Sequence, residues 1–386
     1  MPPDSAPVQL TLRWVSLALV VLTLGSRLPA QSLRVDVPLP ELQARAMQDS
    51  LDPSAHYNLA LGYMSRKKYD LAEQSLQTAL AIDPRFALAQ LALAVCRDKQ
   101  LDVLDILRGD SAARAAYREI QLLYQRAFLI DPFVDVRLMA LVTSVSRGGQ
   151  YASALKAFLE GRYPEAYQKF GLELDERLDG APRDSAGVGL LWLHALSAVQ
   201  SKEYAAAEAD FQALIRIANR RASTDSINSS PLNVNEFRYM LAALKQQAGA
   251  PDEALPLYQE VLEADVSNYM AHVQMARIHE DAKDWPAAVK ERRRAVEVSP
   301  DDASLLTDLG VTLGRSGDFA GAVVALREAV AANPRDVRPL FWLGIAELQL
   351  NDREAARSAF WRFVALAPSR QQSQVAVARE KLAALQ

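Results

Sequence analysis

Apolar and small residues recur at a fixed spacing in the last third of the chain. Three successive blocks of equal length, 269–302, 303–336 and 337–370, align without gaps. Each block places an apolar residue directly before a small one, at Met275-Ala276, Leu309-Gly310 and Leu343-Gly344. Further along, each block has an alanine at the same offset (Ala288, Ala322, Ala356), and each ends close to a proline (Pro300, Pro334, Pro368). A period of this length predicts a stack of similar structural units.

The small residues give each block the form of a helical hairpin. Two antiparallel helices approach closely only where side chains are small, so glycine or alanine marks the point at which they cross. Proline has no amide hydrogen to continue the helical hydrogen-bond ladder, so it ends the second helix. Each block is therefore predicted to be helix, turn, helix.

The same pattern extends towards the N-terminus with less regularity. Residues 53–86 (with Ala60, Ala72 and Pro84) and 235–268 (with Ala242 and Ala254) are further units. Weaker units are predicted at 147–180 and 188–221. Residues 85–132 form a stretched unit, because Pro84 and Pro132 lie further apart than one period allows. We expect an insertion near 99–111 and an extra helix near 133–146.

These repeats resemble those of the tetratricopeptide-repeat family. The resemblance implies an all-α fold, a right-handed superhelical solenoid of helix-turn-helix repeats whose concave face binds peptides or proteins. We expect irregular units in the middle of the array and a capping helix at 371–386. The array is expected in two parts, 53–222 and 235–370, joined by a loop at 223–234 and preceded by a linker and first helix at 31–52.

The N-terminal residues follow the order of a signal peptide. Arg13 precedes an apolar run from Trp14 to Gly25, which small residues up to Ala30 follow. As a helix this run spans about 18 Å, short of the ~30 Å hydrocarbon core. We expect export to the bacterial periplasm with removal of residues 1–30. Because Leu28 is large for its position before the cleavage site, an uncleaved anchor in the inner membrane, facing the periplasm, stays open as the alternative. No cysteine follows the run, which excludes a lipid anchor.

Composition and charge narrow the classes of partner. Half of the residues are hydrophobic and only 7% are aromatic, which favours helix over strand. The formal net charge is −4, without the basic excess that binding to a phosphate backbone needs. Nucleic acid is therefore not expected as a partner.

No sequence motif indicates catalysis or cofactor binding. The chain has no Walker loop, no G-x-S-x-G elbow and no C-x-x-C-H haem-attachment motif. Gly187 and Gly189 lack the third glycine of a dinucleotide-binding turn. We therefore expect no enzyme activity, no cofactor and no bound metal.

Histidines and the single cysteine are assigned to packing. His272 and His279 lie seven positions apart on one predicted helix with Glu280 beside them, so a metal site is conceivable. Both histidines occupy positions that hold large packing residues in the other units, which favours packing; His56 and His194 stand alone. Cys96 lies in an apolar run, cannot form an intramolecular disulfide and is expected to be buried.

Charged clusters are assigned to the surface and to helix ends. The run Lys290–Arg294 spans more than one helical turn, so its side chains point in several directions and we expect a solvated face rather than a binding patch. Asp83 and the pair Asp301-Asp302 lie at turns between repeats, where carboxylates favour the positive end of the next helix.

The resemblance also implies where a partner binds, on successive first helices that line the concave face. Aromatic, methionine and arginine side chains are the residues that anchor protein interfaces. The candidates at these positions are Tyr57, Asn58, Tyr239, Met240, Arg277, Phe341 and Trp342. For Phe341 and Trp342, packing under the capping helix is an equally open interpretation.

The sequence thus favours a non-catalytic scaffold or adaptor of the cell envelope that binds a protein or peptide segment. Two alternatives stay open. One is an envelope enzyme, or a protein that binds a small ligand or metal through the irregular residues 99–235. The other is a structural protein that self-associates.

Overall fold

The computed structural model describes residues 37–102, 105–106, 108, 110–135, 149–183, 186–224 and 234–385. In this part the chain consists of helices joined by turns. No strand occurs among these residues, so the predicted all-α class is confirmed. The predicted signal peptide at 1–30, most of the extra helix near 133–146 and most of the loop at 223–234 lie outside the described residues. Within them, no helix is long and apolar enough to cross a membrane.

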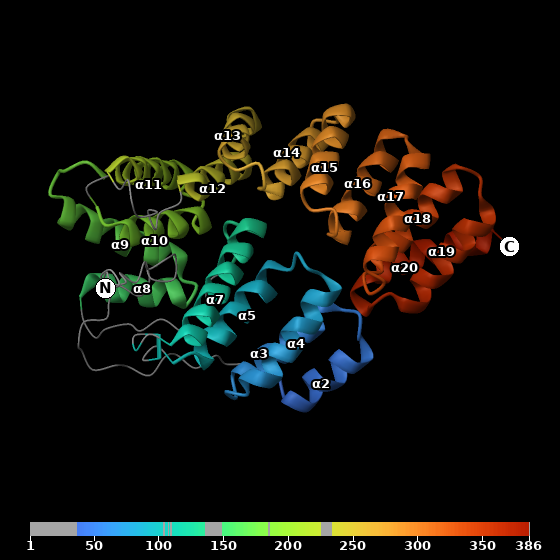
Figure 1. Ribbon diagram of the computed structural model, residues 1–386, viewed down its shortest axis with the longest axis horizontal. Helices are drawn as coiled ribbons and strands as arrows, with labels where there is room; N and C mark the ends of the chain where they lie inside the picture. The colour runs from blue at the N-terminus through green and yellow to red at the C-terminus, as the bar shows by residue number, and fades with distance from the viewer. Residues whose placement is uncertain are drawn as a thin grey trace, which may run out of the picture.

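Consecutive helices pack against each other as hairpins (Figure 1). In the N-terminal half the pairs are α3 (Pro53–Met64) with α4 (Tyr69–Ile82), α5 (Ala87–Gln100) with α7 (Ser111–Ile130), α8 (Gln150–Leu159) with α9 (Tyr163–Leu178), and α10 (Val188–Gln200) with α11 (Tyr204–Thr224). In the C-terminal half they are α12 (Val234–Gln247) with α13 (Pro251–Ala264), α14 (Tyr269–Asp281) with α15 (Trp285–Val298), α16 (Ala303–Ser316) with α17 (Phe319–Ala332), and α18 (Arg338–Gln349) with α19 (Arg353–Leu366). Helix α2 (Leu39–Gln48) precedes the hairpins, and η3 (Ser369–Gln371) and α20 (Gln372–Ala384) follow them.

Aspartate or asparagine begins many of these helices. The side chain before the first turn accepts a hydrogen bond from a backbone amide two or three positions ahead. The residues that do so are Asp52, Asp110, Asn268, Asp284, Asp302, Asp318 and Asp352. Such a cap stabilises a helix by about 1 kcal/mol, because the first amides have no partner within the helix. Asp302 therefore has the helix-capping role expected from the sequence, whereas Asp83 ends α4 and accepts from the backbone amide of Arg85.

Small residues let the two helices of each hairpin approach closely. The repeat alanines Ala60, Ala72, Ala242, Ala254, Ala276, Ala288, Ala322 and Ala356 have no exposed surface. A Cβ atom on Gly310 would lie 2.5 Å from Cγ of Leu326, and one on Gly344 would lie 2.8 Å from the ring of Phe360. Both distances are far inside van der Waals contact, so a side chain at either glycine would force the neighbouring side chain or its helix to shift. The second helices end as predicted, with Pro84, Pro300, Pro334 and Pro368 each following a C-cap residue.

The turn inside each hairpin repeats as strictly as the helices do. A positive φ recurs once per repeat in the C-terminal half, at Gly249, Lys283, Gly317 and Asn351. Lys67 has a φ of 57° at the equivalent place in the first hairpin. Only glycine adopts this conformation without a cost, which is about 1–2 kcal/mol for other residues. The sequence period therefore extends to the backbone conformation of the turns.

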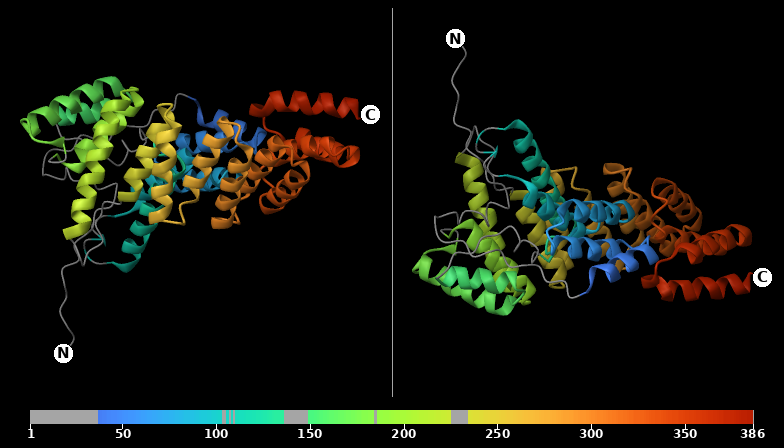
Figure 2. Two further views of the ribbon diagram at one scale, coloured as in Figure 1. Left: turned by 90° about the horizontal axis from the view of Figure 1, so that it is seen from above. Right: turned by 90° about the horizontal axis from the view of Figure 1, so that it is seen from below.

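The solenoid bends back until its first hairpin meets its last ones (Figure 1). In both views of Figure 2 the blue helices of the N-terminal repeat lie beside the orange and red C-terminal helices. Hydrogen bonds connect the end of α4 to α16 and to the turn after α17, and the turn after α2 to the turn after α19. The concave face is therefore not open along its whole length, as a simple superhelix would leave it, because the chain covers part of it.

The close crossing at Gly310 predicts a specific loss of stability. We expect Gly310→Ala to lower the free energy of unfolding by about 1–2 kcal/mol, because overlap with Leu326 outweighs the gain in helix propensity. Gly314 on the same helix is the matched control, since a Cβ there meets only Ala322 Cβ at 3.8 Å. Gly314→Ala should be neutral or stabilise by up to about 1 kcal/mol. Urea unfolding followed by circular dichroism distinguishes the two, and equal stabilities would refute the close-approach argument.

Candidate protein-binding site

Arg85 connects the turn after α4 to helix α16. Its Nη2 donates to Asp308 Oδ2 at 2.7 Å and to the backbone oxygen of Ser304 at 3.1 Å. The two charged side chains are 12% and 28% exposed, so the pair is largely shielded from water. Burial alone would raise the pKa of the Asp308 carboxyl, but Arg85 and Arg292 hold it below its usual value.

Arg292 extends this network within the C-terminal repeats. Its Nε donates to Glu280 Oε1 at 2.9 Å and its Nη1 to Asp308 Oδ2 at 3.2 Å, while Thr312 Oγ1 donates to the same Glu280 oxygen at 2.6 Å. Arg292 and Glu291 are each only 5% exposed. The expectation of a solvated face for Lys290–Arg294 is therefore wrong for these two residues, because they face neighbouring helices, whereas Lys290, Arg293 and Arg294 are exposed.

Further polar contacts join the first repeat to the last helices. Asn333 Nδ2 donates to the backbone oxygens of Ala81 and Ile82, at 3.2 and 3.1 Å, where the last turn of α4 leaves them without helical partners. Arg338 lies 3.6 Å from Asp83. The contacts of Arg85, Asn333 and Arg338 thus fix one end of the first hairpin against α16 to α18.

The turn before α3, at the same end of the hairpin as the turn after α4, contacts the residues around η3. Arg370 Nε lies 3.0 Å from Asp52 Oδ1, and Ser369 Oγ donates to Asp49 Oδ2 at 2.7 Å. Leu51 packs on the apolar cluster that includes Phe341 and Phe363. We call this whole set of contacts between residues 49–85 and 304–370 the closure.

An inner pocket of about 520 Å³ lies behind the closure. Its charged lining consists of Arg277, Arg292, Arg315, Arg338, Arg370, Asp83, Glu280 and Asp308, and its aromatic lining of Phe341, Trp342 and Phe363. Arg277 and Arg315 are exposed and Trp342 is half-buried. Arg277 donates to Gln274 Oε1 at 3.3 Å. The pocket therefore offers guanidinium groups and one aromatic face to a binding partner.

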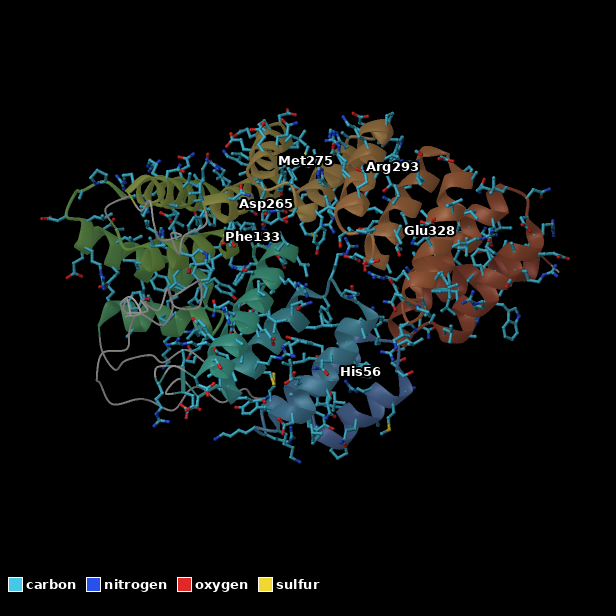
Figure 3. All side chains as sticks on the ribbon, in the orientation of Figure 1. His56, Phe133, Asp265, Met275, Arg293 and Glu328 are labelled. Carbon is cyan, nitrogen blue, oxygen red and sulfur yellow. The ribbon has the colours of Figure 1, made fainter. Side chains whose placement is uncertain are left out.

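A second groove, which we call the α7–α12 groove, has a volume of about 600 Å³. Its walls include Leu122, which is 59% exposed, together with Phe128 and Met240. Tyr239 crosses its floor and donates from its hydroxyl to the backbone oxygen of Leu129 at 2.9 Å. Burial raises the pKa of Tyr239. Asp265, labelled in Figure 3, lies in the turn between α13 and α14 at the edge of this groove.

The residues expected to contact a partner differ in accessibility. Tyr239, Met240 and Phe341 are buried, at 3%, 2% and 8% exposure, so in this structure their side chains pack inside the protein. Tyr57 and Trp342 are half-buried, and Asn58 and Arg277 are exposed. The structure brings Arg277 and Trp342 together in the inner pocket with Phe341 beneath them, while Tyr239 and Met240 line the other groove. Partner binding by these residues stays a prediction.

Three histidines each contact one carboxylate side chain. His272 Nδ1 lies 2.7 Å from Glu291 Oε2, His279 lies 3.8 Å from Asp284, and the buried His194 contacts Asp210. His56 contacts the backbone oxygen of Ser50. No group of three or more potential metal ligands occurs among the residues that the structure describes. His272 is buried, and Glu291 is its polar partner.

Cys96 is fully buried, as predicted, and its Sγ contacts the backbone oxygen of Tyr69 at 3.2 Å. Burial raises the pKa of the thiol to about 11. The thiol is therefore protonated at neutral pH, a state in which it is a poor nucleophile.

Sequence reasoning missed the residues of the closure. Arg85, Asp308 and Asn333 bind partners in the other half of the chain, far beyond the length of one repeat. One signal was available. Asp308 occupies the repeat position that holds Gln274 and Trp342 in the neighbouring units, so a carboxylate there was unusual for a face expected to bind through apolar groups.

These observations define a helical-repeat protein. Residues 53–86, 239–303 and 307–371 match family models described as tetratricopeptide repeat. These residues are therefore tetratricopeptide repeats, and for them the identification made from the sequence period is confirmed. Repeats of this kind act in general as scaffolds for protein–protein interaction.

The solved structures to which this chain is similar are distant in sequence. The C-terminal part of a TPR repeat-containing protein from Cytophaga hutchinsonii is 14% identical, with a TM-score of 0.49 over 61% of this chain and 87% of that one. Residues 41 to the end of MamA from Desulfovibrio magneticus RS-1 are 18% identical, with a TM-score of 0.37 over 46% of this chain and 94% of that one. No curated protein matches the sequence.

The network around Asp308 predicts a pH-dependent stability. We expect Asp308→Asn to lower the free energy of unfolding by about 1–3 kcal/mol at pH 7, because it leaves Arg85 and Arg292 without their shared carboxylate. Since the folded pKa of Asp308 is below the usual aspartate value of 3.8, its contribution is present above that value and is lost as the pH falls through the folded pKa. The difference between wild type and variant should therefore disappear in acid.

Urea unfolding at a series of pH values measures this difference. Asp301→Asn is the matched control, because Asp301 is exposed in the turn just before α16. A loss of stability as small as that of the control at pH 7 would mean that the network contributes nothing.

Proposed function

We propose that the protein is a non-catalytic scaffold of the cell envelope that holds a segment of a partner protein in the inner pocket. The single observation that carries this proposal is the combination of exposed guanidinium groups with an accessible aromatic ring in one concave place. Arg277 and Arg315 extend from α14 and α16, and Trp342 extends from α18 beside them.

Arginine and tryptophan suit such a role for physical reasons. Both residue types are enriched at positions whose truncation weakens a protein interface by about 2 kcal/mol or more. Arginine binds carboxylates and carbonyls through a planar set of donors, and tryptophan contributes a large apolar area with few rotatable bonds. The inner pocket presents both on helices that are fixed by their neighbours, so little conformational entropy is lost when a partner binds.

The N-terminal sequence supports a location in the envelope. Arg13, the apolar run that follows it and Ala30 fit a signal peptide that directs export to the periplasm. An uncleaved run would instead hold the protein at the inner membrane with the repeats in the periplasm. Either arrangement presents the inner pocket to periplasmic proteins or to the periplasmic parts of membrane proteins.

The α7–α12 groove supports a second candidate function, the binding of a small ligand. Its volume of about 600 Å³ and its mixed lining of Leu122, Phe128, Arg126 and Glu236 are within the range of small-molecule sites. Part of its lining belongs to residues 99–235, where the sequence left a ligand site open. This candidate uses a different part of the array from the inner pocket.

A quantitative pull-down from envelope extract tests the scaffold function. We expect the parent protein to retain a small set of proteins, and Arg277→Ala/Trp342→Ala to lose at least about tenfold of each, because both anchors of the pocket are removed. The matched control is Arg293→Ala/Trp361→Ala, which changes the same residue types at exposed positions outside the pocket. Circular dichroism verifies the fold of each variant. Equal retention by all three proteins would reject the inner pocket and direct attention to the α7–α12 groove.

The expected export has its own test. Protein recovered from the periplasmic fraction should begin at Gln31 when its N-terminal residues are sequenced, because the cleavage site follows Ala30. Recovery from the membrane fraction of a chain that still carries residues 1–30 would support the anchored alternative instead. Recovery from the cytoplasm would contradict both.

A further inference from the structure

Acidic side chains of the first repeat and of the turn before it lie at the closure, and one of them, Asp83, lines the inner pocket. Three carboxylates, Asp49, Asp52 and Asp83, come from the turn before α3 and the turn after α4, and all three contact C-terminal residues. We call them the acidic edge. They are the carboxylates that the N-terminal repeat contributes to the closure, and Arg85 is the positively charged side chain that it contributes.

The surface opposite the acidic edge is rich in arginine. The lining of the inner pocket that comes from the C-terminal repeats contains Arg277, Arg292, Arg315, Arg338 and Arg370, against the two carboxylates of Glu280 and Asp308. We call these five residues the arginine wall. Two of them, Arg338 and Arg370, lie 3.6 and 3.0 Å from carboxylates of the acidic edge. Arg338 also binds Asp336 of the C-terminal repeats, at 2.7 Å, and the first repeat occupies part of this arginine-rich surface.

Two of the contacts that hold the first repeat in place, those of Arg338 and Arg370, are partly exposed, whereas the pair of Arg85 with Asp308 is largely shielded from water. The side chains of Arg338 and Arg370 are 34% and 42% exposed, and ion pairs in such surroundings contribute roughly as little as surface pairs do. Among the described residues, helix pairs that pack tightly are neighbours along the chain, or next neighbours, and none joins the first repeat to the last. Leu51 is the apolar side chain near the first repeat that packs on the C-terminal cluster.

We propose that the acidic edge is an internal occupant of the arginine wall, and that the partner segment is itself acidic and binds by displacing it. This proposal rests on the scaffold function proposed above, and it adds the chemistry of the partner and the means of regulation. While the closure is intact, Asp52 and Asp83 occupy the positions that aspartate or glutamate side chains of the partner take when it binds. The partner meets Arg277 and Arg315 first, because these are exposed while the closure is intact.

Competition of this kind reduces the apparent affinity of the partner. A partner that binds only the released form has an affinity lowered by the fraction of molecules in which the first repeat is released. Weakening the closure without changing the arginine wall must therefore tighten binding. Loss of two partly exposed ion pairs should shift the equilibrium by about tenfold.

The test uses the full chain, as purified, with Asp52→Asn/Asp83→Asn. Asparagine at position 52 keeps the helix cap that accepts from Ser54, so the α3–α4 hairpin is preserved. The control is Asp70→Asn/Asp301→Asn, which changes the net charge equally at exposed positions outside the closure. Fluorescence anisotropy measures binding of labelled hexaglutamate, with hexaglutamine, hexalysine and a thymidine oligonucleotide as comparison probes, and small-angle X-ray scattering measures the radius of gyration.

We expect hexaglutamate to bind the Asp52→Asn/Asp83→Asn variant about tenfold more tightly than the wild type, and the control variant within about twofold of the wild type. The radius of gyration of the first variant should increase. Equal affinity for wild type and both variants would overturn internal occupancy. Absence of hexaglutamate binding to every form, or preference for the oligonucleotide, would overturn the acidic partner.

The scaffold function is judged separately. If the Arg277→Ala/Trp342→Ala variant loses its captured proteins while hexaglutamate fails to bind, the inner pocket is the working surface and the proposed chemistry of the partner is wrong. If the same variant keeps its captured proteins while hexaglutamate competes with the acidic edge, the inner pocket is not where those proteins bind, and the internal occupancy holds.

Discussion

The structure depends on how closely two helices can approach where a small side chain recurs once in every repeat. At Gly310 and Gly344 there is no room even for a Cβ atom, because Leu326 and Phe360 fill the space. This constraint sets the separation of the helices within each hairpin, and the recurring positive φ at Gly249, Lys283, Gly317 and Asn351 sets the turn between them. Identical units placed at an identical offset produce a regular curve. The curve in turn brings the first repeat to the last.

The sequence was sufficient to predict the hairpins and insufficient to predict the closure. Periodicity is a local property, so Ala288, Ala322 and Ala356 could be assigned to helix crossings from their spacing alone. The approach of Arg85 to Asp308 depends on the curvature accumulated over all the units between them, including the irregular ones, and a small change in each unit would separate them. No sequence pattern within one repeat shows this accumulated curvature. The charged residues of the closure therefore resembled ordinary surface residues.

The candidate site was predicted in part, for a related reason. Repeat positions identify which side chains come from first helices, and the structure brings two of those candidates, Arg277 and Trp342, into one pocket. Repeat positions do not show which of those side chains are covered by neighbouring helices. Tyr239 lies against α7, where its hydroxyl bonds to Leu129, and Phe341 packs against Phe363 at a ring distance of 5.3 Å. At these positions the aromatic side chains pack in the interior of the protein, because the concave side of the array has little free space at its centre.

Contact between Asp52 and Arg370 has a consequence for how the protein unfolds. In a linear repeat array the terminal units have one neighbour instead of two, so they fray first and unfolding spreads inward from them. Here the first and last described hairpins support each other across the closure, and neither behaves as a free end. Fraying at one side must then break contacts on the other. Local opening should therefore be rarer, and unfolding more nearly all-or-none, than in an array of the same length whose ends do not meet.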